Sequence, residues 1–393
     1  MKNSLLLALL VPAVVLADVW RPGHFEIDGW RKSVPADDAK SNVFSPIGLA
    51  VSLAMLGEGT GGEHRVNISE ALGLLSDFGS AFSYVFQSYA QLSASNTVSI
   101  TFAPSIWARK LKKFDIDYRR SLQRNFEAET GLLTSSLAIN AWTEAKTDGR
   151  IAQLVEKVDP RTEVLLANAV AFEGAWAKGF DRNRTADRPF RCDDGRLVQV
   201  PTMHGECNVA VISNEHAYVA RVPFAAPGVS MLYLLPPAGQ KLASFRDEVF
   251  AKFSIDEMKT IFRTESGAEL KHGMARLALP RMEIASHWNL LKTLAAFKVP
   301  QSGYARIGPD FKINEVVQVD YIKIVETGYS LTPGVLPPSD KKAKRHVWQD
   351  EEEDEPQALP KIDVKLDRPF LFFVWDENSD TLILSGQFTG RDA

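Results

Sequence analysis

The chain has 393 residues, of which 45% are hydrophobic and 24% are charged, and its formal net charge is -4. These are ordinary globular values, and the weak negative charge excludes a global electrostatic preference for nucleic acid or an anionic membrane. A chain of this length buries enough surface to fold without a disulfide framework.

The first residues predict export. Residues 2–17 combine Lys2, an apolar run and the small residues Val15 and Ala17. This pattern predicts a signal peptide over residues 1–17, and its apolar run is too short to span a bilayer. We therefore expect a secreted, extracellular protein without a membrane segment. Residues 18–393 are expected to form a single domain, because no linker divides the first 325 residues.

Helices dominate the first part of the chain and strands the later part. Ser45 and Pro46 predict the start of an apolar helix, which the glycines between residues 57 and 62 end. Hydrophobic patterns predict further elements: helices at 116–128 and 139–157, strands at 163–173, 230–235, 274–284 and 315–325, and a hairpin in the last 25 residues. This order indicates an α+β fold rather than alternating βαβ units.

In an exported protein, two cysteines can form a disulfide and two sequence motifs can be glycosylated. Cys192 and Cys207 are 15 residues apart, and in an oxidising compartment a disulfide closing that loop contributes about 3 kcal/mol. Two unpaired thiols are the alternative. Asn67 and Asn183 each begin an Asn-X-Ser/Thr motif, which predicts a glycoprotein.

Residues 326–366 break the globular pattern. They hold five prolines, a basic run at residues 341–345 and an acidic run at residues 350–355. Such a sequence buries little apolar surface to offset the entropy of ordering it. Because it lies between a predicted strand and a predicted hairpin, we expect an exposed internal loop, and loops of this length usually carry function.

Six segments, in order along the chain, resemble the serpin family over nearly the whole mature length: NVFSPIGLAVSLAML, INAWTEAKTDGRIAQLV, TEVLLANAVAFEGAWAKGF, LVQVPTMHGE, LALPRMEIASHWNLLKTL and DRPFLFFVWDENSDTLILSG. The resemblance implies a serpin fold with three β-sheets, about eight to nine helices and an exposed reactive-centre loop. It also implies an activity without a catalytic site: a protease cuts the loop, which then inserts into the central sheet and traps the protease.

The hinge of the loop departs from the inhibitory pattern. Glu326 and Gly328 match hinge residues of the family, and inhibitory members continue with small residues. Here the hinge consists of Glu326, Thr327, Gly328, Tyr329, Ser330, Leu331, Thr332 and Pro333. Insertion would force the phenol of Tyr329 under the sheet, at a cost of about 1–3 kcal/mol. Pro333 would remove a hydrogen-bond donor from a central strand, so we expect no deep insertion.

Two further sites are implied by the resemblance. The family's gate beneath the central sheet resembles a cluster of Ser45, Asn168 and Gln318, although Gly48 replaces a usual serine and Gln318 a usual histidine. Where the family has a Lys–Glu pair at the top of the sheet, this chain has Arg281 and Glu326, which are suited to bidentate pairing. Trp176 is expected to cover them. Plain structural packing is the alternative for all of these residues.

The bond that a protease would cut is predicted in the basic run. Arg345 is the first candidate and Lys342 the second, because trypsin-like and convertase-like pockets pair a buried carboxylate with Arg or Lys. The alternative is that the two charged runs only keep the loop solvated.

No motif indicates an enzyme, a cofactor or a metal. A G-x-G-x-x-G pattern at residues 57–62 follows a helix instead of a strand, so it fails the test for dinucleotide binding. A basic stretch could bind a sulfated glycan or be a solvated face; it contains Arg109, Lys110, Lys112, Lys113, Arg119, Arg120 and Arg124.

Three functions remain, and we expect a monomer in each. The first is a non-inhibitory binding, storage or carrier protein on a serpin scaffold. The second is a precursor that is cut at the basic run. The third is an inhibitor of a trypsin-like or convertase-like extracellular serine protease. The hinge favours the first two.

Overall fold

The computed structural model describes residues 25–35, 39–74, 77–213, 215–252, 262, 270–308, 310–327 and 362–391. These residues form eight α-helices, in agreement with the expected eight to nine. The helices are α2 (Phe25–Ser33), α3 (Pro46–Glu58), α4 (Gly62–Leu72), α5 (Phe78–Ala94), α6 (Ile116–Phe126), α7 (Ser136–Lys146), α8 (Leu242–Lys252) and α10 (Leu291–Ala296). Two 3₁₀ turns are η1 (Leu111–Lys113) and η2 (Arg182–Arg184).

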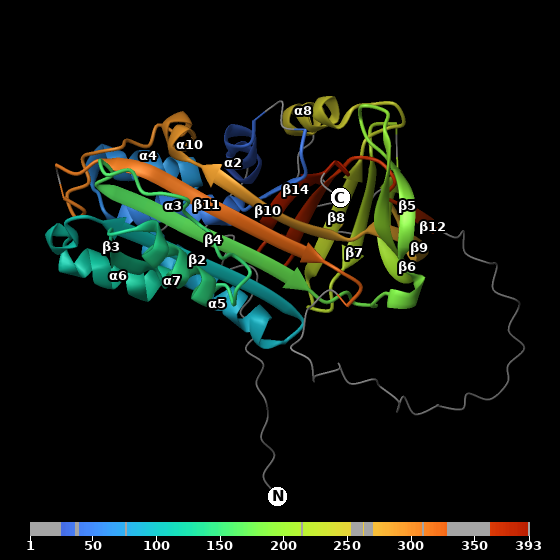
Figure 1. Cartoon of the computed structure of the whole chain (residues 1–393), viewed down its shortest axis with the longest axis horizontal. Helices are drawn as coiled ribbons and strands as arrows, with labels where there is room; N and C mark the ends of the chain where they lie inside the picture. Colours follow the sequence, from blue (N-terminus) through green and yellow to red (C-terminus); the bar gives the residue numbers. More distant parts are fainter. Residues whose placement is uncertain are drawn as a thin grey trace, which may run out of the picture.

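A five-stranded sheet forms the broad face of the molecule (Figure 1). Its strands, in spatial order, are β10 (Met282–Asn289), β11 (Ile313–Ile324), β4 (Val164–Gly174), β2 (Val98–Ala108) and β3 (Glu129–Leu132). The two central strands, β11 and β4, run parallel, with a continuous register from Glu315–Leu165 to Lys323–Glu173. Every residue of β4 is buried, as its nearly unbroken apolar sequence requires. Most of β11 is buried too, although it carries several polar residues.

The second sheet has nine strands. Its main path is β1 (Asn42–Phe44), β14 (Thr381–Phe388), β13 (Phe370–Asp376), β8 (Val229–Leu235), β7 (Tyr218–Pro223), β6 (Leu197–Ser213), β9 (Leu270–Pro280) and β12 (Ile362–Lys365), with β5 (Ala186–Arg191) beside β6. Three sheets were expected. The described strands form two, because β6 pairs with β5 near its start and with β7 near its end, while its long ladder with β9 joins both regions.

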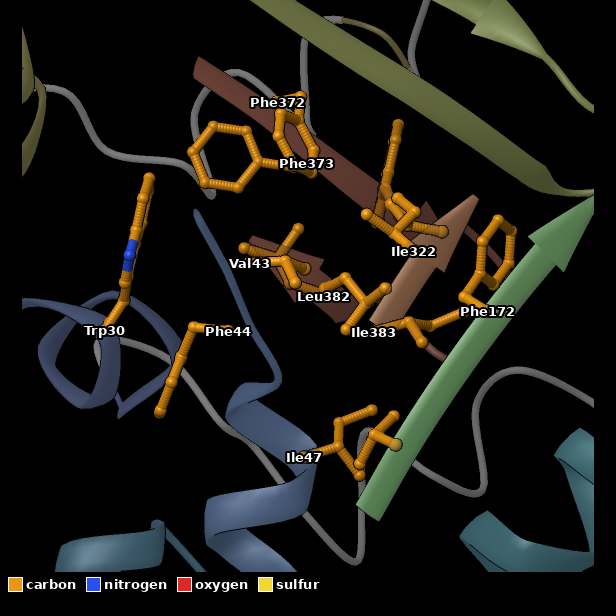
Figure 2. Close-up of a cluster of buried hydrophobic side chains, with 14 of the residues drawn as sticks. Trp30, Val43, Phe44, Ile47, Phe172, Ile322, Phe372, Phe373, Leu382 and Ile383 are labelled. Atoms are coloured by element: carbon orange, nitrogen blue, oxygen red, sulfur yellow. The ribbon is translucent and has the colours of Figure 1, made fainter. Parts of the chain in front are cut away.

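The apolar helix α3 lies inside the molecule. Pro46 occupies its first turn, and the Ser45 side chain caps it by accepting a hydrogen bond from the Gly48 N–H at 3.1 Å. All but the last of its 13 residues are buried, as expected for a helix that is apolar all round. Ile47 projects from α3 toward Phe172 of β4 and Ile383 of β14, in the cluster that Figure 2 shows.

Two sequence predictions were wrong in their boundaries. The helix predicted at 139–157 is α7, which ends at Lys146 because Asp148 and Gly149 adopt positive φ angles of 49° and 78°. The strand predicted at 274–284 is two strands, which separate at Arg281 and belong to different sheets. None of the described helices has both the length and the apolar character needed to cross a membrane.

Candidate functional site

The polar loop joins the ends of two strands. Glu326 and Thr327 follow β11, and β12 begins at Ile362. Gly328 to Pro333 of the hinge, Lys342 and Arg345 lie outside the described residues, as does the signal peptide. The predictions about them remain predictions.

At the first root of the loop, Glu326 is buried, with 1% of its surface exposed. Its carboxylate accepts hydrogen bonds from the Thr185 hydroxyl at 2.5 Å and from Arg281 Nε at 2.6 Å. Its backbone carbonyl accepts the Phe180 N–H at 3.0 Å. Burial opposes ionisation, but the hydrogen bonds from Thr185 and Arg281 outweigh it and lower the pKa of Glu326. The root is thus held by a charged cluster of Glu326, Arg281 and Thr185.

Trp176 holds the same root through its indole. Its Nε1 donates to the carbonyl of Val325 at 3.1 Å. The ring stacks on Phe224 at a centroid distance of 4.7 Å. Trp176 therefore ties the residue before Glu326 to the second sheet. The structure thus pairs Arg281 with Glu326 and places Trp176 against the residue before Glu326. That Trp176 covers the pair remains a prediction.

Deeper in the sheet, the gate residues meet the start of α3. The Asn168 side chain donates to the carbonyl of Gly48 at 2.7 Å. Gln318 Nε2 donates to the carbonyl of Ser45 at 3.0 Å. The Ser45 hydroxyl donates to the carbonyl of Ile383 at 2.9 Å and so reaches β14. These bonds connect both central strands to α3.

The absence of a side chain at Gly48 makes room for the side chain of Gln318. A Cβ atom at position 48 would lie 2.8 Å from Gln318 Oε1 and 3.0 Å from Val170 Cγ2, closer than packed atoms approach. The long Gln318 side chain fills the space that a side chain at position 48 would need. The two departures from the family pattern are therefore linked by packing.

Asp320 completes this cluster, and sequence reasoning missed it. It lies two residues after Gln318 on the same face of β11 and is 0% exposed. Its carboxyl group accepts the Ser45 N–H at 2.9 Å and the Gln318 amide at 2.8 Å. The described part of the chain provides no ion pair for it, and burial raises its pKa to about 7. No clear signal in the sequence marked it, because β11 carries other polar residues, among them Glu315 and Gln318.

The predicted disulfide is wrong. Cys192 and Cys207 are both unpaired and buried. Cys192 lies in the turn between β5 and β6, whereas Cys207 lies on β6 ten residues beyond Leu197. Ten residues of strand span about 33 Å, and a disulfide needs Cα atoms within about 7 Å.

Both predicted glycosylation sites lie at the surface. Asn67 is half-buried on α4 and Asn183 is exposed on η2. Modification of either asparagine remains a prediction.

The basic stretch at residues 109–124 is partly used for internal contacts. Arg109 donates to the carbonyls of Thr162 and Asp159, and Arg120 pairs with Asp117 at 3.1 Å. Binding of a sulfated glycan there remains a prediction.

Comparison with known proteins agrees with this architecture. The family model described as "Serpin (serine protease inhibitor)" matches residues 23–390. Alpha-1-antitrypsin 1-1 of Mus musculus is 25% identical over 390 residues, which cover 93% of this chain and 87% of that protein.

Solved structures show the same fold at low identity. Native protease nexin-1 with heparin superposes with a TM-score of 0.77 at 18% identity, covering 96% of this chain and 99% of that one. Human thyroxine-binding globulin also gives a TM-score of 0.77, at 19% identity, covering 95% of this chain and 98% of that one. The chain belongs to the serpin family.

Proposed function

We propose that this serpin is a secreted, non-inhibitory protein that presents a protease-sensitive loop, as a binding, storage or carrier protein or as a cleaved precursor. Export is proposed from the signal sequence at residues 1–17. The observation that carries the proposal is the bulky, proline-containing sequence of the hinge, residues 326–333.

The closed sheet defines the packing that an inserted loop would meet. An inserted strand would have to separate β4 from β11 along their continuous register. On the inner face of these strands, Val170, Phe172 and Ile322 are 0% exposed. A tyrosine and a proline entering such packing add steric and hydrogen-bond penalties that small residues avoid.

The inhibitor of a trypsin-like or convertase-like protease is the second candidate. It is favoured by the charged cluster of Glu326, Arg281 and Thr185, which holds the loop root in the arrangement that the family resemblance implies. It is also favoured by the similarity to alpha-1-antitrypsin 1-1.

Incubation with trypsin separates the two candidates. We expect clean cleavage of the loop within the basic run, at Arg345 or Lys342, and no covalent complex. If the cut loop does not insert, water hydrolyses the ester that joins it to the serine of trypsin, and the protease is released. The products are read on a denaturing gel and by mass spectrometry. An SDS-resistant adduct that forms with active trypsin, but not with trypsin blocked at its active-site serine, would instead establish inhibition.

A further inference from the structure

A basic groove lies between β5, the start of β6 and the segment that follows β12. Its volume is about 480 Å³, and its lining includes three cationic side chains, those of Arg188, Arg191 and Lys365, together with the imidazole of His204. The lining contains one acid, Asp367, whose carboxylate already pairs with Lys365 at 2.8 Å. The groove therefore presents an excess of positive charge.

The arginines of the groove have no acidic partner among the described residues. Arg188 Nε donates to His204 Nε2 at 3.3 Å, so the guanidinium faces a neutral imidazole. Burial first, and then the charges of Arg188 and Arg184, lower the pKa of His204, which places Arg184 close to the same site. The charges of the two arginines therefore add to the effect of burial and contribute positive potential at this site.

The sequence around β5 carries the same excess. Residues 178–191 contain five basic and two acidic side chains, in a chain whose net charge is -4. Asp181 and Asp187 are the two acids; both are exposed and neither forms an ion pair within the described residues. Guanidinium groups bind carboxylates through paired hydrogen bonds, so an acidic peptide fits this surface.

The chain itself carries an acidic peptide close by. Residues 350–355 are all Asp or Glu, and Ile362, where β12 begins, lies only seven positions after Glu355. Seven residues span at most about 25 Å, and Lys365 at the other end of this short strand lines the groove. A tether of this length gives the run a high effective concentration at the groove.

We propose that the basic groove binds the chain's own acidic run at residues 350–355. The competing partner is the loop's basic run at residues 341–345, but pairing the two runs would require both loop segments to be ordered. The groove holds its cations on paired strands, so only the acidic run loses entropy when it binds there.

Docking would leave residues 341–345 without their acidic neighbour and available to a protease. This inference goes beyond the proposed function, because the loop can be cut whether or not the run docks.

Zero-length cross-linking with a carbodiimide tests the proposal on the full-length protein. The reagent joins a carboxylate to a lysine amine in direct contact, and peptide mass spectrometry identifies the pairs. We expect cross-links from residues 350–355 to Lys365, lost in high salt because the contact is between exposed charges. In the double variant Arg184→Glu, Arg188→Glu the yield should fall at least about fivefold.

Matched variants separate docking from simple tethering to Lys365. Lys110→Glu with Arg124→Glu reverses two exposed cations near and on α6, at the other end of the molecule from β5 (Figure 1), and should leave the yield unchanged. An unchanged melting temperature shows that each variant is folded. The proposal is overturned if the groove variant gives the wild-type yield, if no cross-link forms, or if residues 350–355 join only Lys341, Lys342 and Lys344. Cross-links between isotope-labelled and unlabelled chains would assign the groove to a second copy instead.

Discussion

Replacing Asp320 with asparagine should stabilise this serpin at pH 8 by about 2–4 kcal/mol. The expectation follows from burial of the carboxyl group beside neutral donors alone, which raises its pKa to about 7. An unfolded chain ionises aspartate near pH 4, and each unit of difference corresponds to about 1.4 kcal/mol. The Asn variant can still accept the Ser45 N–H, and its amide can donate to Gln318 Oε1, which has no hydrogen-bond partner within the described structure.

The sign of the pH dependence gives a second readout for Asp320. Below about pH 4 the group is protonated in both states and contributes nothing. As the pH rises from 4 to 7, the unfolded state releases its proton first, so the wild type loses stability in that window. The Asn variant should therefore match the wild type at pH 4 and exceed it at pH 8 in urea unfolding.

The exposed residue Asp187 provides a control, because Asp187→Asn should change stability at neither pH. Lower stability of Asp320→Asn at pH 8 would show that an ionised Asp320 is stabilised by the Ser45 N–H and the Gln318 amide, contrary to this reasoning.

Removal of the Arg281 side chain should destabilise the protein by about 2–3 kcal/mol, because it leaves the buried carboxylate of Glu326 without its cation. The figure is reduced from that of a fully buried pair because the Arg281 side chain is 41% exposed, against 2% for Glu326. Thr185 would still donate to Glu326. The free energy of unfolding of Arg281→Ala, measured in urea at pH 7, gives the effect.

The neighbouring strand offers a matched control for Arg281. Arg276 pairs with Asp363 through two short bonds, but both side chains are more than half exposed. Arg276→Ala should cost less than about 1 kcal/mol. Because the pKa of Glu326 is lowered in the folded state, the contribution of its partners is present above about pH 4 and is lost as the pH falls below it. Equal losses for Arg276→Ala and Arg281→Ala would contradict the importance of burial at the loop root.

Local signals in the sequence predicted the elements that depend on local structure. Ser45 and Pro46 fixed the start of α3, and the apolar run around Asn168 predicted β4. Order along the chain, together with the family resemblance, was sufficient for the α+β class and the serpin fold. The pairing of Arg281 with Glu326 also followed from the resemblance, because their separation in sequence gives no local signal.

Features that depend on distant contacts escaped prediction. The hydrophobic alternation shifts by one residue at Arg281, from Leu277 and Leu279 to Met282 and Ile284. This shift alone could not reveal that β9 and β10 lie in different sheets. The cysteine spacing predicted a bridge, but the long strand β6 carries Cys207 away from Cys192. Asp320 resembles a surface residue in sequence, and only the position of α3 shows that its carboxyl group meets the Ser45 N–H.

The melting temperature of the protein after one cut within residues 341–345 tests most directly whether the loop enters the five-stranded sheet. A loop excluded by Tyr329 and Pro333 adds no strand, so the cut and uncut proteins should melt within about 3 °C of each other. Insertion would place a new strand between β4 and β11, hydrogen-bonded to both. A rise of more than about 10 °C on cutting would contradict the non-inhibitory function proposed for this chain.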